Sequence, residues 1–199
     1  EEQFYLFWPP LLAAAYRWLP RSARYILVGG LALASFQLGQ ALIHSHPSFA
    51  YYMLPTRAGE LMAGGLAYWL TSDIKKIPSV LGLLASLVGV ALVGLSIVSL
   101  DESSGFPGYA ALLPTLGTAL LLYTGSVDRT LVAAVLSFPG LVAIGRVSFS
   151  LYLWHWPVMA FYRYAYGTPS SAGYIACVIA MVAMTLISYF AVERRFRTH

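Results

Sequence analysis

The chain has 199 residues, of which 59% are hydrophobic and only 10% are charged. Soluble domains carry about 25% charged residues, so this composition, with a mean hydropathy of +0.70, excludes an ordinary soluble domain and indicates an integral membrane protein. The net charge of +4 does not point to nucleic acid, because the basic residues lie in short connections between apolar segments.

Apolar segments of membrane length follow one another along the whole chain. A helix that spans a bilayer needs about 20 mostly apolar residues, and seven segments meet this requirement, which predicts an all-α, polytopic transmembrane bundle. They cover residues 3–19, 25–43, 49–70, 80–100, 109–125, 141–162 and 173–192. We expect the third to be interrupted by Pro55, Arg57 and Glu60 and the sixth by His155 and Pro157, because broken helices are tolerated where they line a cavity.

Basic residues gather in alternate connections and in the C-terminal tail. They are Arg17, Arg21, Arg24, Lys75, Lys76, Arg129, Arg194, Arg195 and Arg197, whereas the other connections contain HSHP, DESSGFPG and GTPSSAG. By the positive-inside rule the basic connections and the C-terminus are cytoplasmic, so the chain begins on the outer side. Because the first residue is Glu1 rather than Met, the sequence predicts a fragment, preceded by an odd number of spans if the true N-terminus is cytoplasmic.

Several residues have a structural interpretation. Gly82, Ser86 and Gly89 recur at helical spacing, which predicts close helix packing. The single cysteine, Cys177, lies in an apolar run without metal-site spacing and is expected to be a small buried side chain. No pattern in the sequence predicts a metal site.

The most informative residues are ionisable side chains inside apolar segments. They are Glu1, Glu2, Arg57, Glu60, Arg146 and His155. A charge at the middle of a bilayer costs roughly 2.5–3.5 kcal/mol on insertion scales. We therefore expect these groups to face a protein-lined cavity or a partner, as in a protein that handles a polar substrate within the membrane.

Each of these groups also has a structural alternative. Arg57 and Glu60 are three residues apart, so on a helix they share one face and could form a self-neutralising ion pair, or could bind an anionic or carbonyl group. Glu1 and Glu2 point about 100° apart on a helix, so only one of them can face a given cavity. The alternative is that their segment forms an aromatic belt at the outer interface. His155, between two tryptophans, could transfer protons or be structural.

Five stretches in order resemble the membrane acyltransferase 3 family. They are EEQFYLFWPPLL, YMLPTRAGELMAGGLAY, DESSGFPGYAALLPTLGTALL, IGRVSFSLYLWHWPV and SYFAVERRFR, and together they cover nearly the whole chain. The resemblance is to the branch that O-acetylates bacterial surface glycans such as lipopolysaccharide O-antigen. It implies a roughly ten-helix domain in the bacterial inner membrane, of which residues 1–199 are the C-terminal part, often followed in that branch by an extracytoplasmic SGNH domain.

The resemblance also implies acetyl-CoA as the donor on the cytoplasmic side and a glycan hydroxyl as the acceptor on the outer side. The candidate catalytic residues that it carries over are Glu2, Arg57, Glu60 and His155, with Arg57 and Arg146 as candidates for donor binding. The family signature of a basic residue eleven positions before a histidine does not occur here, because Ile144 and Leu33 stand at that distance from His155 and His44. The main catalytic histidine is therefore expected outside this chain.

Two smaller departures from the family pattern do not affect these candidates. Arg195 stands where a proline is more common, and Phe149 stands where a tyrosine is common.

The buried charges also suit a transporter of an anionic metabolite or a lipid-linked sugar. A scaffold subunit of the cell envelope is a third interpretation, in which these charges would tolerate substitution.

Overall fold

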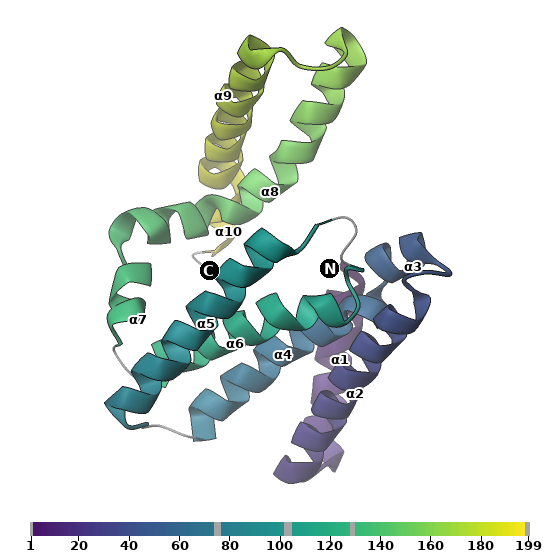
Figure 1. Cartoon of the computed structure of the whole chain (residues 1–199), viewed down its shortest axis with the longest axis vertical. Helices are drawn as coiled ribbons and strands as arrows, with labels where there is room; N and C mark the ends of the chain where they lie inside the picture. Colours follow the sequence, from purple (N-terminus) through teal and green to yellow (C-terminus); the bar gives the residue numbers. More distant parts are fainter. Residues whose placement is uncertain (1, 74–76, 102–104, 128–129, 198–199) are drawn as a thin grey trace. The chain divides into compact units, whose positions relative to one another are not determined.

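The computed structural model describes residues 2–73, 77–101, 105–127 and 130–197, and the regular structure within these ranges is entirely helical (Figure 1). The all-α prediction is therefore confirmed. Lys75, Lys76 and Arg129, which contribute to the expected orientation, lie outside the described residues. The chain forms two compact units, Glu1–Val135 and Leu136–His199, which are considered separately.

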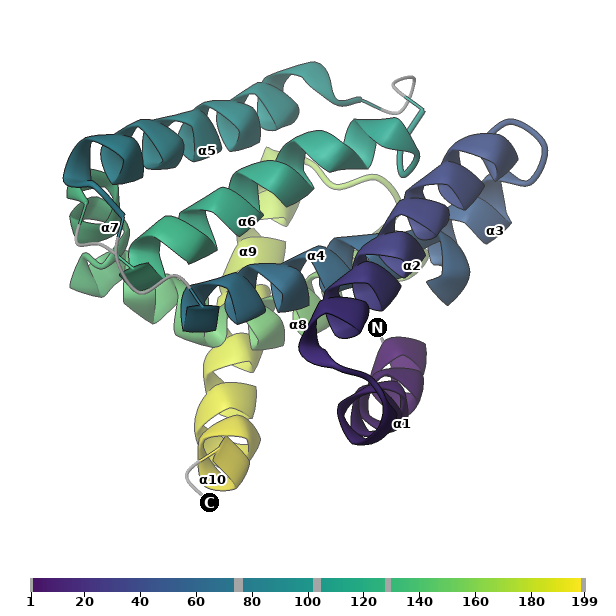
Figure 2. The ribbon, with the colours of Figure 1, turned by 90° about the horizontal axis from the view of Figure 1, so that it is seen from below.

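The first unit contains most of the helices. They are α1 (Glu2–Trp18), α2 (Arg21–Leu42), the short α3 (Pro47–Tyr52), α4 (Leu54–Asp73), α5 (Ser79–Ser99), the 3₁₀ turn η1 (Tyr109–Ala111), α6 (Leu112–Val127) and α7 (Leu131–Leu136), which ends at the boundary of the unit. Helix α4 packs between α2 and α6, and α6 packs between α4 and α5 (Figure 2). The apolar core lies where α1, α2 and α4 meet, and its buried members are Phe4, Val28, Ala32, Ala58 and Met62.

Helices α5 and α6 approach closely along small side chains. A Cβ added to Gly89 would lie 3.0 Å from the carbonyl oxygen of Gly117, and one added to Gly117 would lie 2.9 Å from the carbonyl oxygen of Gly89. Gly82 and Ser86 are buried on α5 too, and the Ser86 hydroxyl donates to the Leu83 carbonyl oxygen at 2.8 Å. The predicted close packing at Gly82, Ser86 and Gly89 is confirmed.

The third apolar segment is interrupted, but the charged residues do not cause the break. The chain leaves α3 at Met53, whose backbone is extended at φ −94° and ψ 143°, and α4 begins at the next residue. Pro55 lies in the first turn of α4, where a backbone N–H would have no partner within the helix, so the proline is tolerated there. Arg57 and Glu60 lie on continuous helix, so the expectation that they interrupt it is wrong.

The second unit is a helical hairpin. It contains α8 (Pro139–Tyr166), α9 (Ser171–Ser188), a π-helical turn η2 (Tyr189–Glu193) and α10 (Arg194–Arg197). Gly167 ends α8 at a positive φ of 79°, a conformation that suits glycine, and the Ser170 hydroxyl accepts a hydrogen bond from the Gly173 N–H to cap α9.

The expected interruption of the sixth segment is wrong. Helix α8 is continuous over 28 residues with His155 and Pro157 inside it, and it changes direction along its length (Figure 1). Proline removes one backbone hydrogen bond and crowds the preceding turn. Because the residues after Pro157 can again form helical backbone hydrogen bonds, the helix continues through this position instead of ending.

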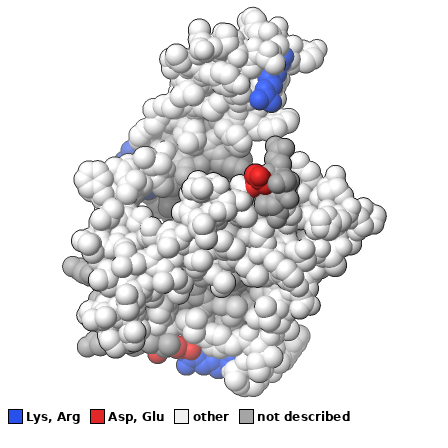
Figure 3. Space-filling model, viewed as in Figure 1, with Lys and Arg blue, Asp and Glu red and all other residues white. Residues whose placement is uncertain are grey.

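Four helices of the described part are long and apolar enough to cross a membrane. They are Arg21–Leu42, Ser79–Ser99, Tyr109–Val127 and Ser171–Glu193. The large apolar side chains on their outer faces are exposed, for example Ile97 and Val98 on α5, and the face in Figure 3 carries few charged groups. The chain is thus a multi-pass membrane bundle. That α1, α4 and α8 also cross the bilayer stays a prediction.

The close approach of α5 and α6 predicts different effects on stability for two glycine substitutions on α5. Gly89→Ala should lower the free energy of unfolding by about 1–3 kcal/mol, because the new methyl group meets backbone that cannot move independently. Gly94→Ala is the matched control, since a Cβ there meets nothing within 4 Å, and it should be neutral or slightly stabilising. Unfolding of the purified protein in detergent measures both; equal stabilities would contradict the close approach.

Candidate active site

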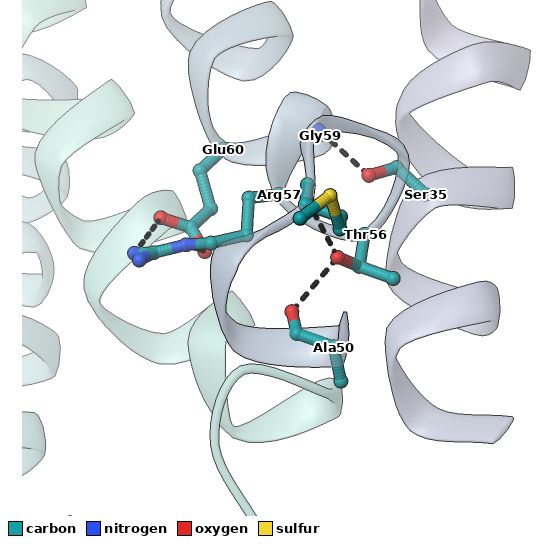
Figure 4. Close-up of polar contacts among 7 residues, drawn as sticks. Ser35, Ala50, Thr56, Arg57, Gly59 and Glu60 are labelled. Carbon is teal, nitrogen blue, oxygen red and sulfur yellow. Dashed lines mark hydrogen bonds and ion pairs between the residues drawn. The ribbon is translucent and has the colours of Figure 1, made fainter. Parts of the chain in front are cut away.

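The break between α3 and α4 is closed by a buried threonine. Thr56 is only 1% exposed, and its Oγ1 lies 2.8 Å from the carbonyl oxygens of Ala50 and of Met53 (Figure 4). A hydroxyl has one proton, so it donates to either carbonyl at a given moment. Thr56 therefore joins the end of α3 to the first turn of α4 and fixes the position of the residues that follow.

Two side chains from other helices hold the first turns of α4. The Leu54 N–H, which has no partner within its helix, donates to Oε1 of Gln3 on α1 at 3.2 Å. The Gly59 N–H donates to the buried hydroxyl oxygen of Ser35 on α2 at 2.9 Å (Figure 4). A Cβ added to Gly59 would lie 2.7 Å from the carbonyl oxygen of Ala32, so glycine is required for this contact between α2 and α4.

Arg57 and Glu60 form a two-point ion pair on this fixed turn. The Arg57 Nε lies 3.3 Å from Oε1 of Glu60, and Nη2 lies 3.1 Å from Oε2 (Figure 4). The side chains are partly buried, with 36% and 24% of their surfaces exposed. The predicted shared helix face is confirmed, and the pair neutralises both charges within the apolar bundle.

Two aromatic rings orient the guanidinium group. The Arg57 Cζ lies 5.4 Å from the ring centroid of Tyr51 on α3 and 5.6 Å from that of Phe106, which precedes η1. These distances are within the range of cation–π attraction. The rings of Tyr51 and Phe106 also contact each other, with centroids 6.5 Å apart, so α3 and the segment before η1 together determine where the cation lies.

The carboxylate of this pair borders a groove. Glu60 and Gly64 on α4 and Thr115 and Thr118 on α6 line a space of about 240 Å³. The groove is therefore lined by the Glu60 carboxylate and by two threonines among apolar residues. Sequence analysis did not identify these threonines; their spacing of three residues places them on one helix face, but only the packing of α6 on α4 brings them to Glu60.

His155 lies in the second unit, on an exposed part of α8. Its Nδ1 lies 2.5 Å from the Tyr152 carbonyl oxygen of the preceding turn. A carbonyl oxygen only accepts hydrogen bonds, so Nδ1 is the donor in this contact. The catalytic role of His155 stays a prediction.

Arg146 lines a separate groove of about 710 Å³ in the second unit, with Tyr189, Phe190 and Arg194 among its other lining residues. One turn farther along α8, the buried hydroxyl of Ser150 donates to Oε2 of Glu193 at 2.9 Å. Sequence analysis did not single out Glu193. Its only signal was a carboxylate at the end of an apolar segment that continues into the arginine-rich tail.

The other candidates can be placed only in part. Glu1 and the side chain of Glu2 lie outside the described residues, so their predicted roles stay predictions. Among the described residues there is no group of three or more His, Cys, Asp or Glu side chains that could hold a metal ion. The structure therefore brings together Arg57 and Glu60, with Thr115 and Thr118 beside them, as its best-defined candidate site.

Comparisons with known proteins assign the chain to a family. The chain is 29% identical over 172 residues to the peptidoglycan O-acetyltransferase OatA of Listeria monocytogenes, covering 80% of the chain and 27% of that protein. It is 26% identical over 208 residues to the O-acetyltransferase OatA of Staphylococcus aureus, covering 99% of the chain and 34% of that protein. The chain thus spans about a third of the length of these curated relatives.

No solved structure matches the chain. The acyltransferase 3 family model, described as an acyltransferase domain, matches residues 1–193, which include α1 to α9 and the π-helical turn. The resemblance that the sequence stretches indicated is confirmed, and the chain belongs to the acyltransferase 3 family of membrane proteins.

Proposed function

We propose that the chain is part of a membrane O-acetyltransferase that transfers an acetyl group from acetyl-CoA to a hydroxyl of a cell-surface glycan. The family assignment and the O-acetyltransferases among its relatives support this activity. The observation that carries the proposal is the two-point Arg57–Glu60 pair beside a hydroxyl-lined groove within an apolar bundle.

The acceptor is proposed from chemistry and from the relatives together. The Listeria relative is named for peptidoglycan, a polymer of the cell surface whose sugars carry hydroxyl groups. We therefore place peptidoglycan beside lipopolysaccharide among the acceptor glycans. In this reaction the hydroxyl oxygen bonds to the acyl carbon, the carbon–sulfur bond breaks, and the hydroxyl proton ends on the released thiol.

Arg57 and Glu60 suit two parts of this reaction. The guanidinium group can stabilise the negative charge that develops on the carbonyl oxygen, and a partly buried site strengthens that interaction. Glu60 can accept a hydrogen bond from a hydroxyl that enters the groove while it also orients Arg57. Neither residue is assigned as the general base that deprotonates the acceptor hydroxyl. The family signature that contains a histidine does not occur in this sequence.

The place of Arg57 along α4 favours a role near the acceptor. Asp73 ends the same helix sixteen residues later, which is about 24 Å at the α-helical rise. The loop charges put the Asp73 end of α4 and the C-terminus on the cytoplasmic side. Arg57 then lies toward the outer side of the inner membrane, where a surface glycan is available, and the donor phosphates would need a different site.

Arg57→Ala should reduce O-acetylation of the surface glycan about 100-fold, the effect typical of losing one oxyanion-stabilising group. The measurement is NMR of glycan from a deletion host that carries the full-length parent gene, with equal amounts of each variant in the membrane. Arg163→Ala, which changes an exposed arginine of the second unit, is the control and should retain the wild-type signal.

Three results would contradict parts of the proposal. A full signal with Arg57→Ala would reduce Arg57 to a structural role. No signal with well-expressed wild type would contradict the glycan acceptor. Transport of substrate by wild type without consumption of acetyl-CoA would favour the transporter instead.

Glu60→Gln removes the negative charge of this residue but keeps the size and shape of its side chain. The amide keeps an oxygen that can accept from Arg57, but it removes the negative charge and weakens the hydrogen bond to a hydroxyl. We expect the initial rate of acetyl transfer to fall about 10-fold or more while the amount of protein in the membrane stays unchanged. If Glu60 only orients Arg57, Glu60→Gln should retain most of the activity, and assays in isolated membranes with acetyl-CoA distinguish these results.

A further inference from the structure

A second polar pocket lies at the opposite end of α2 and α4 from the Arg57–Glu60 pair. It has a volume of about 400 Å³ and lies within the first unit, between the end of α1, the start of α2 and the end of α4. The polar side chains that line it include Tyr16, Arg21, Arg24, Tyr68, Ser72 and Asp73. None of these residues belongs to the candidate active site.

The single carboxylate of the pocket already has two partners. Asp73 forms an ion pair with Arg21 through Oδ1, and its Oδ2 accepts a hydrogen bond of 2.8 Å from the hydroxyl of Tyr25. This arrangement compensates the charge of Arg21 and joins the start of α2 to the end of α4. The charge of Arg24 is not balanced by this carboxylate.

Arg24 is held in place but lacks a partner for part of its guanidinium group. Its Cζ lies 4.1 Å from the ring centroid of Tyr16, and that ring in turn packs edge-on against Trp69 at 6.0 Å. The Arg24 Nε is buried and has no hydrogen-bond partner among the described residues. Buried N–H groups in native proteins nearly always have an acceptor, so this group indicates a ligand.

We propose that this pocket binds a phosphate group. Stacking on Tyr16 fixes the planar guanidinium of Arg24, and a fixed arginine suits the oxygens of a phosphate. Tyr68 and Ser72 also line the pocket, and α2, whose N-terminal end is the positive end of the helix dipole, begins at Arg21. Asp73 does not repel the ligand strongly, because Arg21 and Tyr25 occupy both of its oxygens.

Two kinds of molecule could supply the phosphate. One is coenzyme A, in its free form or as the acyl thioester, and the other is the headgroup of an anionic phospholipid at the membrane surface. Both have a phosphate ester joined to an apolar or extended part. The pocket is proposed from its own residues, so it does not depend on the acetyl-transfer function.

The test uses the purified full-length protein in nanodiscs, with Arg24→Gln as the variant and Arg17→Gln as the control. Arg17 is a neighbouring exposed arginine that does not line the pocket. One arm measures the Kd of coenzyme A by calorimetry, and the other measures the phosphatidylglycerol retained after exchange into zwitterionic lipid. Arg24→Gln should weaken one of these about 10-fold or more, while Arg17→Gln stays within about twofold of wild type.

Each arm identifies one source of the phosphate. Loss of coenzyme A binding assigns the pocket to the donor, and loss of phosphatidylglycerol assigns it to a lipid. If both ligands bind Arg24→Gln as they bind wild type, the proposal is wrong. Should Arg24→Gln fail to fold, Arg24→Lys keeps the charge but not the planar fork, and unchanged binding by that variant would overturn the proposal. Acetyl transfer is measured separately, so failure of the proposed function remains distinguishable.

Discussion

The contact between α2 and the first turns of α4 determines the geometry of the candidate active site. Gly59 allows the two backbones to approach until its N–H reaches the Ser35 hydroxyl, and Thr56 holds the bend from α3 into α4. Arg57 lies between these two fixed residues, so its side chain starts from a backbone that cannot rotate. A membrane bundle has little hydrophobic driving force between its helices; close contacts between small residues and a few buried hydrogen bonds therefore determine which faces meet.

This constraint explains how an arginine is accommodated among apolar helices. A lone arginine at membrane depth costs roughly 2.5–3.5 kcal/mol on insertion scales, whereas Arg57 has a two-point bond to Glu60 and lies near the rings of Tyr51 and Phe106. The ion pair supports the fold and also holds the Glu60 carboxylate, which lines the groove, in a fixed orientation. The structural and functional interpretations of the pair are thus compatible, because the same hydrogen bonds that neutralise the charges also orient them.

Much of the fold could be predicted from the sequence, because apolar length identifies helices and small residues such as Gly89 identify close packing. The sequence also placed Arg57 and Glu60 on one helix face, which depends only on helical spacing. The positions of breaks were harder to predict: Met53 is extended while Pro157 is tolerated within α8, and local propensity does not distinguish a proline that ends a helix from one that bends it. Thr118 beside Glu60 depends on the packing of α6 against α4, which no local pattern contains.

Helix α4 connects two polar sites of different character. Near its start the opposite charges of Arg57 and Glu60 are paired with each other. At its end Asp73 pairs with Arg21, while the Arg24 Nε has no acceptor within the described part of the chain. A neutral pair beside hydroxyl groups suits a neutral acceptor and charge that develops only during reaction, whereas an uncompensated guanidinium suits a ligand that is already anionic. The two ends of α4 therefore differ in the ligand chemistry that they suit, and the helix holds them apart by its length of 20 residues.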